Sequence, residues 1–85
     1  MSERITVEEL AELMKTAAGV TVAPEELQQR FDSGFDTLGL DSLGLLGIVG
    51  ELENRYGTPM PADAERSRTP RQFLDLVNSA IPAGA

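Results

Sequence analysis

The sequence predicts a small all-α protein: a four-helix bundle with three main helices, one short helix, and a long ordered loop between the first and second main helices. Three stretches repeat apolar residues at helical spacing, each behind a helix-start signal, and no stretch alternates as a half-buried strand does. Eighty-five residues suffice for one core. We expect one domain over residues 1–85, with its core at about 5–81 and a frayed C-terminal tail.

The first main helix is predicted over residues 7–18. Thr6 and Glu9 have the spacing of a capping box, in which the cap side chain accepts from a backbone N–H and the glutamate reaches back to the cap. Gly19 supplies a natural stop. The apolar side chains at helical spacing are Leu10, Leu13, Met14 and Ala17.

Residues 20–40 show no sustained periodicity. A structureless loop of this length is unusual in a compact domain, and Pro24 is suited to the first turn of a short helix. We therefore expect an ordered crossover between the first and second main helices. Its apolar anchors are Val22, Leu27, Phe31, Phe35 and Leu38.

The second main helix is predicted over residues 42–56, with Asp41 as N-cap and Gly57 as C-terminal stop. Ser42 lies at the junction of loop and helix, so its hydroxyl lies beside backbone N–H groups that lack intrahelical partners. The helix dipole makes this end slightly positive, and a phosphate attached to Ser42 would be stabilised there. One side of the helix collects Leu45, Ile48, Val49, Leu52 and Tyr56.

The last main helix is predicted to start at Pro70. Two prolines forbid helix over residues 58–61, and residues 62–65 have room for one short turn. Thr69, Pro70 and Gln72 then combine a cap, a first-turn proline and the capping-box spacing. The apolar stripe and the proline that ends the helix are Phe73, Leu74, Leu76, Val77, Ala80 and Pro82.

Composition excludes several functions. The chain has no cysteine for a disulfide or thiolate and no histidine, the usual general base and commonest metal ligand. Its net charge of −7 argues against nucleic acid and anionic membranes as partners and favours proteins with basic patches, although acidity also simply aids solubility. Without a membrane-span run or a signal-peptide pattern, we expect a cytoplasmic protein.

The stretch Leu38–Leu43, Leu-Gly-Leu-Asp-Ser-Leu, resembles the signature of acyl carrier proteins, with Ser42 at the position that receives 4′-phosphopantetheine. The resemblance covers nearly the whole chain, and residues 5–10, 55–57 and 69–78 are most similar to carriers of bacterial type II aromatic polyketide synthases. Peptidyl carriers usually have histidine in place of Asp41, which argues against that branch.

The resemblance implies a carrier with no catalytic residues of its own and no metal site. A phosphopantetheinyl transferase, using coenzyme A and Mg²⁺, would attach the arm to Ser42, and Asp41 would lie where that enzyme approaches. The arm's thiol would hold malonyl units and the growing polyketide as thioesters. The other implied partners are a malonyl transferase, a ketosynthase with its chain-length factor, a ketoreductase and an aromatase or cyclase. The carrier would act as a monomer.

Two leucines beside the serine are candidates for partner docking. Leu43 lies almost opposite the apolar centre of the 42–56 helix, and Leu46 also falls off its core side. An exposed leucine needs no explanation by itself, but next to Ser42 these resemble the family's hydrophobic docking contact. The acidic residues expected to add electrostatic steering, with a solvated face as the alternative, are Asp36, Glu51 and Glu53.

Gly44, Gly47 and Gly50 recur at every third position of the 42–56 helix, opposite its apolar side. A glycine inside a helix costs about 0.8–1.0 kcal/mol relative to alanine, and core packing predicts no need for glycine there. Many carriers have larger or acidic side chains at Gly44 and Gly47, so the chain departs from the family pattern. Our hypothesis is that the lack of side chains at these positions lets a partner protein approach the helix backbone closely. The alternative is that the glycines are neutral substitutions tolerated on an exposed face.

A carrier also needs shelter for its cargo. We expect a groove between the 42–56 helix and the crossover, lined by some of Leu45, Val49, Met60 and Leu74. Ordinary core packing is the alternative for each of these residues.

Other functions remain as rivals. A carrier of fatty acid synthesis differs in its partners, and an unmodified acidic helical interaction module would use the same acidic face without any arm. An enzyme is a poor third, and the spacing of Asp32, Asp36 and Asp41 does not match a calcium-binding EF-hand.

Overall fold

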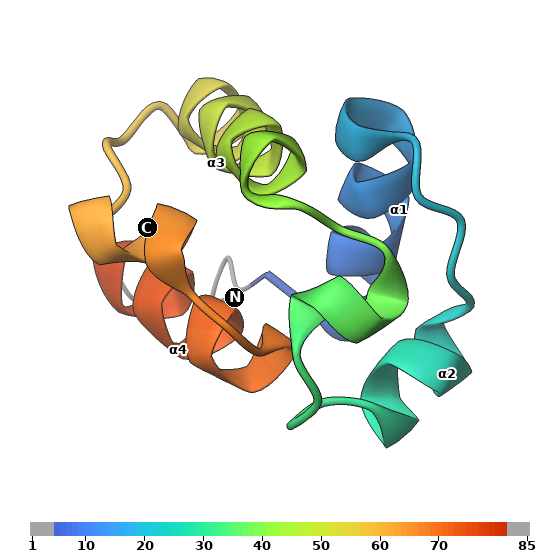
Figure 1. The fold of residues 1–85 in the computed structure, drawn as a ribbon. Coiled ribbons are helices and arrows are strands. Elements are labelled where there is room, and N and C mark those ends of the chain that lie inside the picture. Colours follow the sequence, from blue (N-terminus) through green and yellow to red (C-terminus); the bar gives the residue numbers. More distant parts are fainter. Residues whose placement is uncertain (1–4, 82–85) are drawn as a thin grey trace.

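The computed structural model describes residues 5–81, which form four α-helices and two 3₁₀ helices (Figure 1). The all-α prediction is confirmed, and this part of the chain contains no strand. The frayed tail and Pro82 lie outside the described residues. The elements are α1 (Val7–Ala18), α2 (Pro24–Gln29), η1 (Phe35–Leu38), α3 (Ser42–Tyr56), η2 (Ala62–Arg66) and α4 (Pro70–Ala80).

The predicted starts of the three long helices are confirmed, as are the predicted stops of α1 and α3. The side chains of Thr6, Asp41 and Thr69 each accept a hydrogen bond from the backbone N–H three residues further on, at 3.2, 2.7 and 3.1 Å. Gly19 and Gly57 end α1 and α3 with φ angles of 71° and 62°, a left-handed conformation that favours glycine.

One half of the capping box at α1 was predicted wrongly. Instead of reaching back to its own helix start, the Glu9 carboxylate accepts hydrogen bonds from the Arg55 guanidinium at 3.2 Å and the Tyr56 hydroxyl at 2.8 Å. Glu12 also binds Arg55, at 2.8 Å, and this hydrogen bond is the main reason why the pKa of Arg55 is raised. These contacts tie α1 to the C-terminal end of α3.

The crossover between α1 and α3 is ordered, as predicted. It contains α2 and η1, and it is fastened to the segment before α4. The Phe35 N–H donates to the Arg68 carbonyl at 2.7 Å, and the Phe35 ring meets Phe73 edge-on, with ring centroids 6.0 Å apart. A second link joins the Arg71 N–H to the Phe31 carbonyl at 3.0 Å. The crossover therefore fixes where α3 begins.

The core lies between α1, α3 and α4, with α1 packed mainly against α3, and η2 touching both α3 and α4 (Figure 1). The side-chain amide of Asn78 on α4 closes the bundle, since it both accepts from the Ile5 N–H at 2.7 Å and donates to the Ile5 carbonyl at 3.1 Å. The largest fully buried side chains are Phe73, Leu10, Leu13, Met14, Leu27, Ile48, Leu52, Val77 and Pro70.

Candidate functional site

Ser42 is the first residue of α3, and the residues before it explain why it is exposed. Gly39 adopts a left-handed conformation, with φ of 84°, which turns the chain out of η1. Leu40 is buried and anchors the junction, whereas Asp41 and Ser42 are exposed. Buried Leu40 thus holds the chain in place just before the helix, and the Ser42 side chain is left exposed where the helix begins.

The start of α3 is electrostatically suited to a phosphate on Ser42. Asp41 Oδ1 takes the Gly44 N–H, which leaves the N–H groups of Ser42 and Leu43 without intrahelical acceptors. The first turn of α3 holds no acidic side chain, so the Asp41 cap supplies the carboxylate that interacts with the positive end of the helix dipole. This local geometry is compatible with the prediction that Ser42, with Asp41 as its neighbouring cap, carries the arm.

A hollow of about 600 Å³ opens beside Ser42, within the 300–1,000 Å³ range of small-molecule sites. One wall is the end of the crossover with the start of α3, and the other is the segment from η2 to α4. The residues that line it are Gly34, Phe35, Asp36, Leu40, Asp41, Ser42, Leu45, Glu65, Arg66, Ser67, Arg68 and Thr69.

The position of this hollow corrects the predicted lining of the cargo groove. Leu45 does line it, and the crossover does form one wall. Val49, Met60 and Leu74 instead lie in the core, exposed by only 6, 8 and 6%. The wheel alone could not show that η2 packs against α3 and α4 and brings its own C-terminal end to the hollow.

Leu43 and Leu46 are exposed, as predicted, by 76% and 47%. They line a second, shallow hollow, to which Ser42, Glu65 and Arg66 also contribute. The serine thus lies between a deeper hollow and an apolar patch formed by Leu43 and Leu46.

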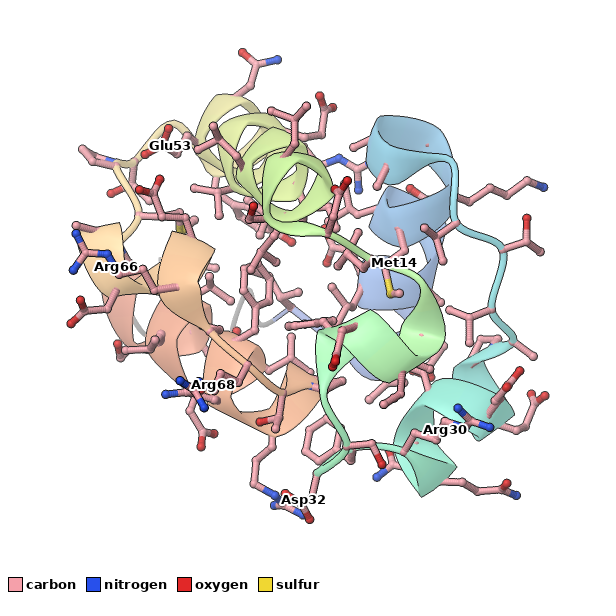
Figure 2. All side chains as sticks on the ribbon, in the orientation of Figure 1. Met14, Arg30, Asp32, Glu53, Arg66 and Arg68 are labelled. Carbon is pink, nitrogen blue, oxygen red and sulfur yellow. The ribbon has the colours of Figure 1, made fainter. Side chains whose placement is uncertain are left out.

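The three acidic candidates do not gather at the serine. Asp36 is exposed and lines the hollow with Ser42. Glu53 instead accepts the Met60 N–H at 2.9 Å, and Glu51 faces Arg55 at 3.8 Å. Figure 2 shows Glu53 near the end of α3 where the chain leaves toward η2, far along the helix from Ser42.

The prediction that packing makes no demand on the three glycines is wrong for two of them. A Cβ atom on Gly44 would come within 2.8 Å of Leu40 Cδ1 and 3.1 Å of Ala18 Cβ, and one on Gly47 within 3.3 Å of the Ala17 carbonyl oxygen. These glycines let the start of α3 approach the end of α1. A Cβ atom on Gly50 would meet nothing within 4 Å, so only this glycine lacks a packing reason.

The end of η2 and the two residues that follow it were missed as part of the site. Glu65, Arg66, Ser67 and Arg68 all line the hollow beside Ser42. In Figure 2, Arg66 projects outward from η2, and Arg68 lies on the stretch that leads into α4. A sequence signal was present, because Arg66 and Arg68 are two of only seven basic residues in an acidic chain. Their distance from Ser42 along the chain concealed it.

Comparison with known proteins agrees with this geometry. Residues 8–77 match the family model described as a phosphopantetheine attachment site. The chain belongs to the acyl carrier protein family. Members of this family carry acyl groups on 4′-phosphopantetheine, which is accordingly the group that this carrier bears.

Two relatives and one solved structure show how close the likeness is. A probable acyl carrier protein of Streptomyces coelicolor is 62% identical over 81 residues, covering 95% of this chain and 90% of its own. The curamycin polyketide synthase acyl carrier protein of Streptomyces cyaneus is 58% identical over 82 residues, covering 96% and 93%. The apo actinorhodin acyl carrier protein of S. coelicolor has a TM-score of 0.79 at 34% identity, covering 96% of this carrier and 98% of its own chain.

Two further properties of residues 5–81 concern metal ions and membranes. Between residues 5 and 81, no three His, Cys, Asp or Glu side chains come together to hold a metal ion. None of the helices in that part combines the length and apolarity needed to cross a bilayer.

Proposed function

We propose that this carrier holds polyketide intermediates on a 4′-phosphopantetheine arm attached to Ser42 and delivers them to the enzymes of a type II polyketide synthase. The observation that carries the proposal is an exposed hydroxyl at the start of α3, beside free backbone donors and a hollow of about 600 Å³. The match of the chain to polyketide carriers over nearly its full length supports it.

Ser42 would supply one bond and no catalysis. Its Oγ would attack the β-phosphate of coenzyme A in a phosphopantetheinyl transferase, which takes the hydroxyl proton and releases adenosine 3′,5′-bisphosphate. Asp41 is exposed next to it and holds the first turn of α3 in place. The arm's thiol supplies thioester chemistry, and the tether raises the effective concentration of cargo at each docked enzyme.

The hollow beside Ser42 fits the second half of this function, which is temporary shelter of the cargo. Ser42, the proposed attachment point, is part of its lining, and the buried side chains of Phe35, Leu40 and Leu45 make part of that lining apolar. Glu65 and Arg66 are exposed at the η2 wall and keep its edge polar. A reactive chain folded into the hollow would be partly protected from water until a partner binds.

The partners we propose are the transferase, a malonyl transferase, a ketosynthase with its chain-length factor, a ketoreductase and an aromatase or cyclase. They would dock on Leu43 and Leu46, because residues 42–50 contain no charged side chain and these leucines are exposed there. Asp36 is the acidic candidate that lies near enough to Ser42 to steer them.

Truncation of Leu43 tests this docking surface. Because its side chain is 76% exposed, we expect Leu43→Ala to change the free energy of unfolding by less than about 0.5 kcal/mol. We expect it to lower kcat/KM with the cognate ketosynthase about fivefold to tenfold, the cost of losing a docking contact worth about 1 kcal/mol. Unchanged turnover would place docking elsewhere. The matched control is buried Leu45→Ala, which should cost about 2–5 kcal/mol of stability.

Intact mass spectrometry tests the proposed function itself. The protein is incubated with coenzyme A, Mg²⁺ and a promiscuous phosphopantetheinyl transferase, and its mass is recorded. We expect wild type to gain one arm and Ser42→Ala to gain none. No adduct on wild type would instead favour an unmodified acidic interaction module. Turnover with a polyketide ketosynthase, compared with a fatty acid ketosynthase, separates the two kinds of carrier.

A further inference from the structure

Ser67 has an unusual environment for a polar side chain. Its residue is only 7% exposed, and it is the one polar or charged residue among residues 5–81 that is buried. Buried hydroxyl groups in folded proteins nearly always make good hydrogen bonds, because leaving one unmade costs the full desolvation penalty. The contacts of the Ser67 hydroxyl therefore need an explanation.

The hydrogen bond that this hydroxyl makes is a poor one. Ser67 Oγ donates to the Asp63 carbonyl at 3.5 Å, well beyond the 2.7–2.8 Å that is usual for an O–H donor. The Ser67 N–H separately donates to the Ala64 carbonyl at 3.2 Å, so the backbone at the end of η2 is held without the side chain. The hydroxyl is thus buried, weakly bonded and not needed for the local backbone.

Ser67 also lies in the wall of the hollow beside Ser42. Three residues that carry hydroxyl groups line that hollow. Ser42 is the proposed attachment point, and Thr69 Oγ1 is engaged in capping α4, where it accepts the Gln72 N–H at 3.1 Å. Ser67 is the remaining one. Its hydroxyl could exchange the weak hydrogen bond to Asp63 for a shorter one to an acceptor in the hollow.

We propose that the Ser67 hydroxyl donates a hydrogen bond to a ketone oxygen of the cargo, and that it thereby favours β-keto chains over saturated acyl chains in the hollow. This inference rests on the proposed function. A ketone is an acceptor only, and it complements a hydroxyl whose present acceptor is 3.5 Å away. A saturated chain offers no acceptor, so beside such a chain the buried hydroxyl would keep only its weak hydrogen bond to the Asp63 carbonyl. Ser67 would act on cargo specificity and would take no part in catalysis.

The test compares two cargoes of equal length on the intact holo-protein. One is a six-carbon chain with ketones at C3 and C5, labelled with ¹³C at both, and the other is a saturated six-carbon chain. Each is attached to the arm through a stable thioether, and mass spectrometry first verifies that one arm and one cargo are present. The readouts are the ¹³C ketone resonances and the ¹H–¹⁵N resonance of Ser67.

In wild type we expect a ketone resonance to lie downfield of the same resonance in Ser67→Ala, because a hydrogen bond to the oxygen deshields the carbonyl carbon. The downfield position should be kept in the control Ser79→Ala. Ser79 is an exposed α4 serine that donates to its own helix, to the Leu76 carbonyl at 2.6 Å. The saturated cargo should leave the Ser67 amide resonance close to its position in the holo-protein.

An unchanged ketone shift in Ser67→Ala would overturn the proposal. So would a saturated cargo that moves the wild-type Ser67 resonance as far as the diketone does, a comparison that holds even if Ser67→Ala fails to fold. Failure to gain an arm would refute the carrier function and this inference together, whereas a loaded protein without the shift refutes only the role of Ser67.

Discussion

At the scale of single residues, the site depends on two adjacent side chains with different tasks. Asp41 Oδ1 accepts the Gly44 N–H at 2.7 Å and fixes the first turn of α3, while Ser42 presents its hydroxyl outward. Both roles were predictable from sequence, because an N-cap and the residue after it are defined by local chain geometry.

Substitution of Asp41 separates its cap from its charge. We expect Asp41→Ala to lower the free energy of unfolding by about 1 kcal/mol, whereas Asp41→Asn should stay near wild type, because an asparagine side chain caps about as well. The measurement is urea denaturation, paired with the rate of arm transfer. If Asp41→Asn is modified as fast as wild type, the carboxylate has no role in the approach of the transferase and serves the helix alone.

The glycines of α3 give a matched pair of variants. A Cβ on Gly50 would meet nothing within 4 Å, so Gly50→Ala should raise the free energy of unfolding by about 0.8–1.0 kcal/mol. Gly44→Ala should lower it, because overpacking against Leu40 and Ala18 costs about 1–3 kcal/mol. Thermal unfolding measures both. An equal gain in the two variants would show that α1 does not constrain the start of α3.

The same glycines show where sequence reasoning fails at this scale. A helical wheel placed Gly44 and Gly47 opposite the apolar side, which is correct for α3 alone. It could not show that the end of α1, with Ala17 and Ala18, packs against that second side. Whether a glycine is needed at these positions depends on contacts between helices, and the sequence pattern within one helix does not show those contacts.

At the scale of elements, α1 and α3 were predicted with their observed bounds and α4 with its observed start, since each carries its own start signal and apolar stripe. The short elements were harder. Proline at 24 and the apolar anchors indicated α2 and an ordered crossover, but nothing local located η1 at Phe35–Leu38. The wall that η2 gives to the hollow was missed, because it depends on how residues 62–66 pack against α3 and α4.

A surface ion pair fastens the crossover to α4 and gives a pH-dependent prediction. Arg71 Nε lies 2.6 Å from Asp32 Oδ1, and its guanidinium stands 4.7 Å from the centre of the Phe31 ring. Figure 2 shows Asp32 at the edge of the molecule, where the crossover comes near the start of α4. The hydrogen bond from Arg71 lowers the pKa of Asp32 below its ordinary value of 3.8.

Because the folded-state pKa of Asp32 is the lower one, the pair stabilises the fold above the ordinary carboxyl pKa and loses this contribution as the pH falls through the folded value. An NMR titration of the Asp32 carboxyl carbon should give a midpoint below 3.8. In Arg71→Gln the midpoint should return to the ordinary value. Equal midpoints in the two proteins would mean that the pair does not persist in solution.

At the scale of the whole molecule, the fold brings segments from three parts of the chain around one serine. The crossover end, the start of α3 and the η2–α4 segment together line the hollow beside Ser42. The net charge of −7 is spread unevenly, since residues 42–50 carry none of it and several carboxylates are used within the bundle. The proposed docking face is thus mainly apolar, which the overall charge did not predict.

The proposed function requires that Ser42, at the start of α3, bears the phosphopantetheine arm. The most direct measurement is proteolysis of the modified wild-type protein, followed by fragmentation of the peptides in a mass spectrometer. We predict that the arm is found on the peptide that contains Ser42 and on no other serine of the chain. An arm located on Ser33, Ser67 or Ser79, or a Ser42 peptide that stays unmodified in the transferred protein, would contradict the account.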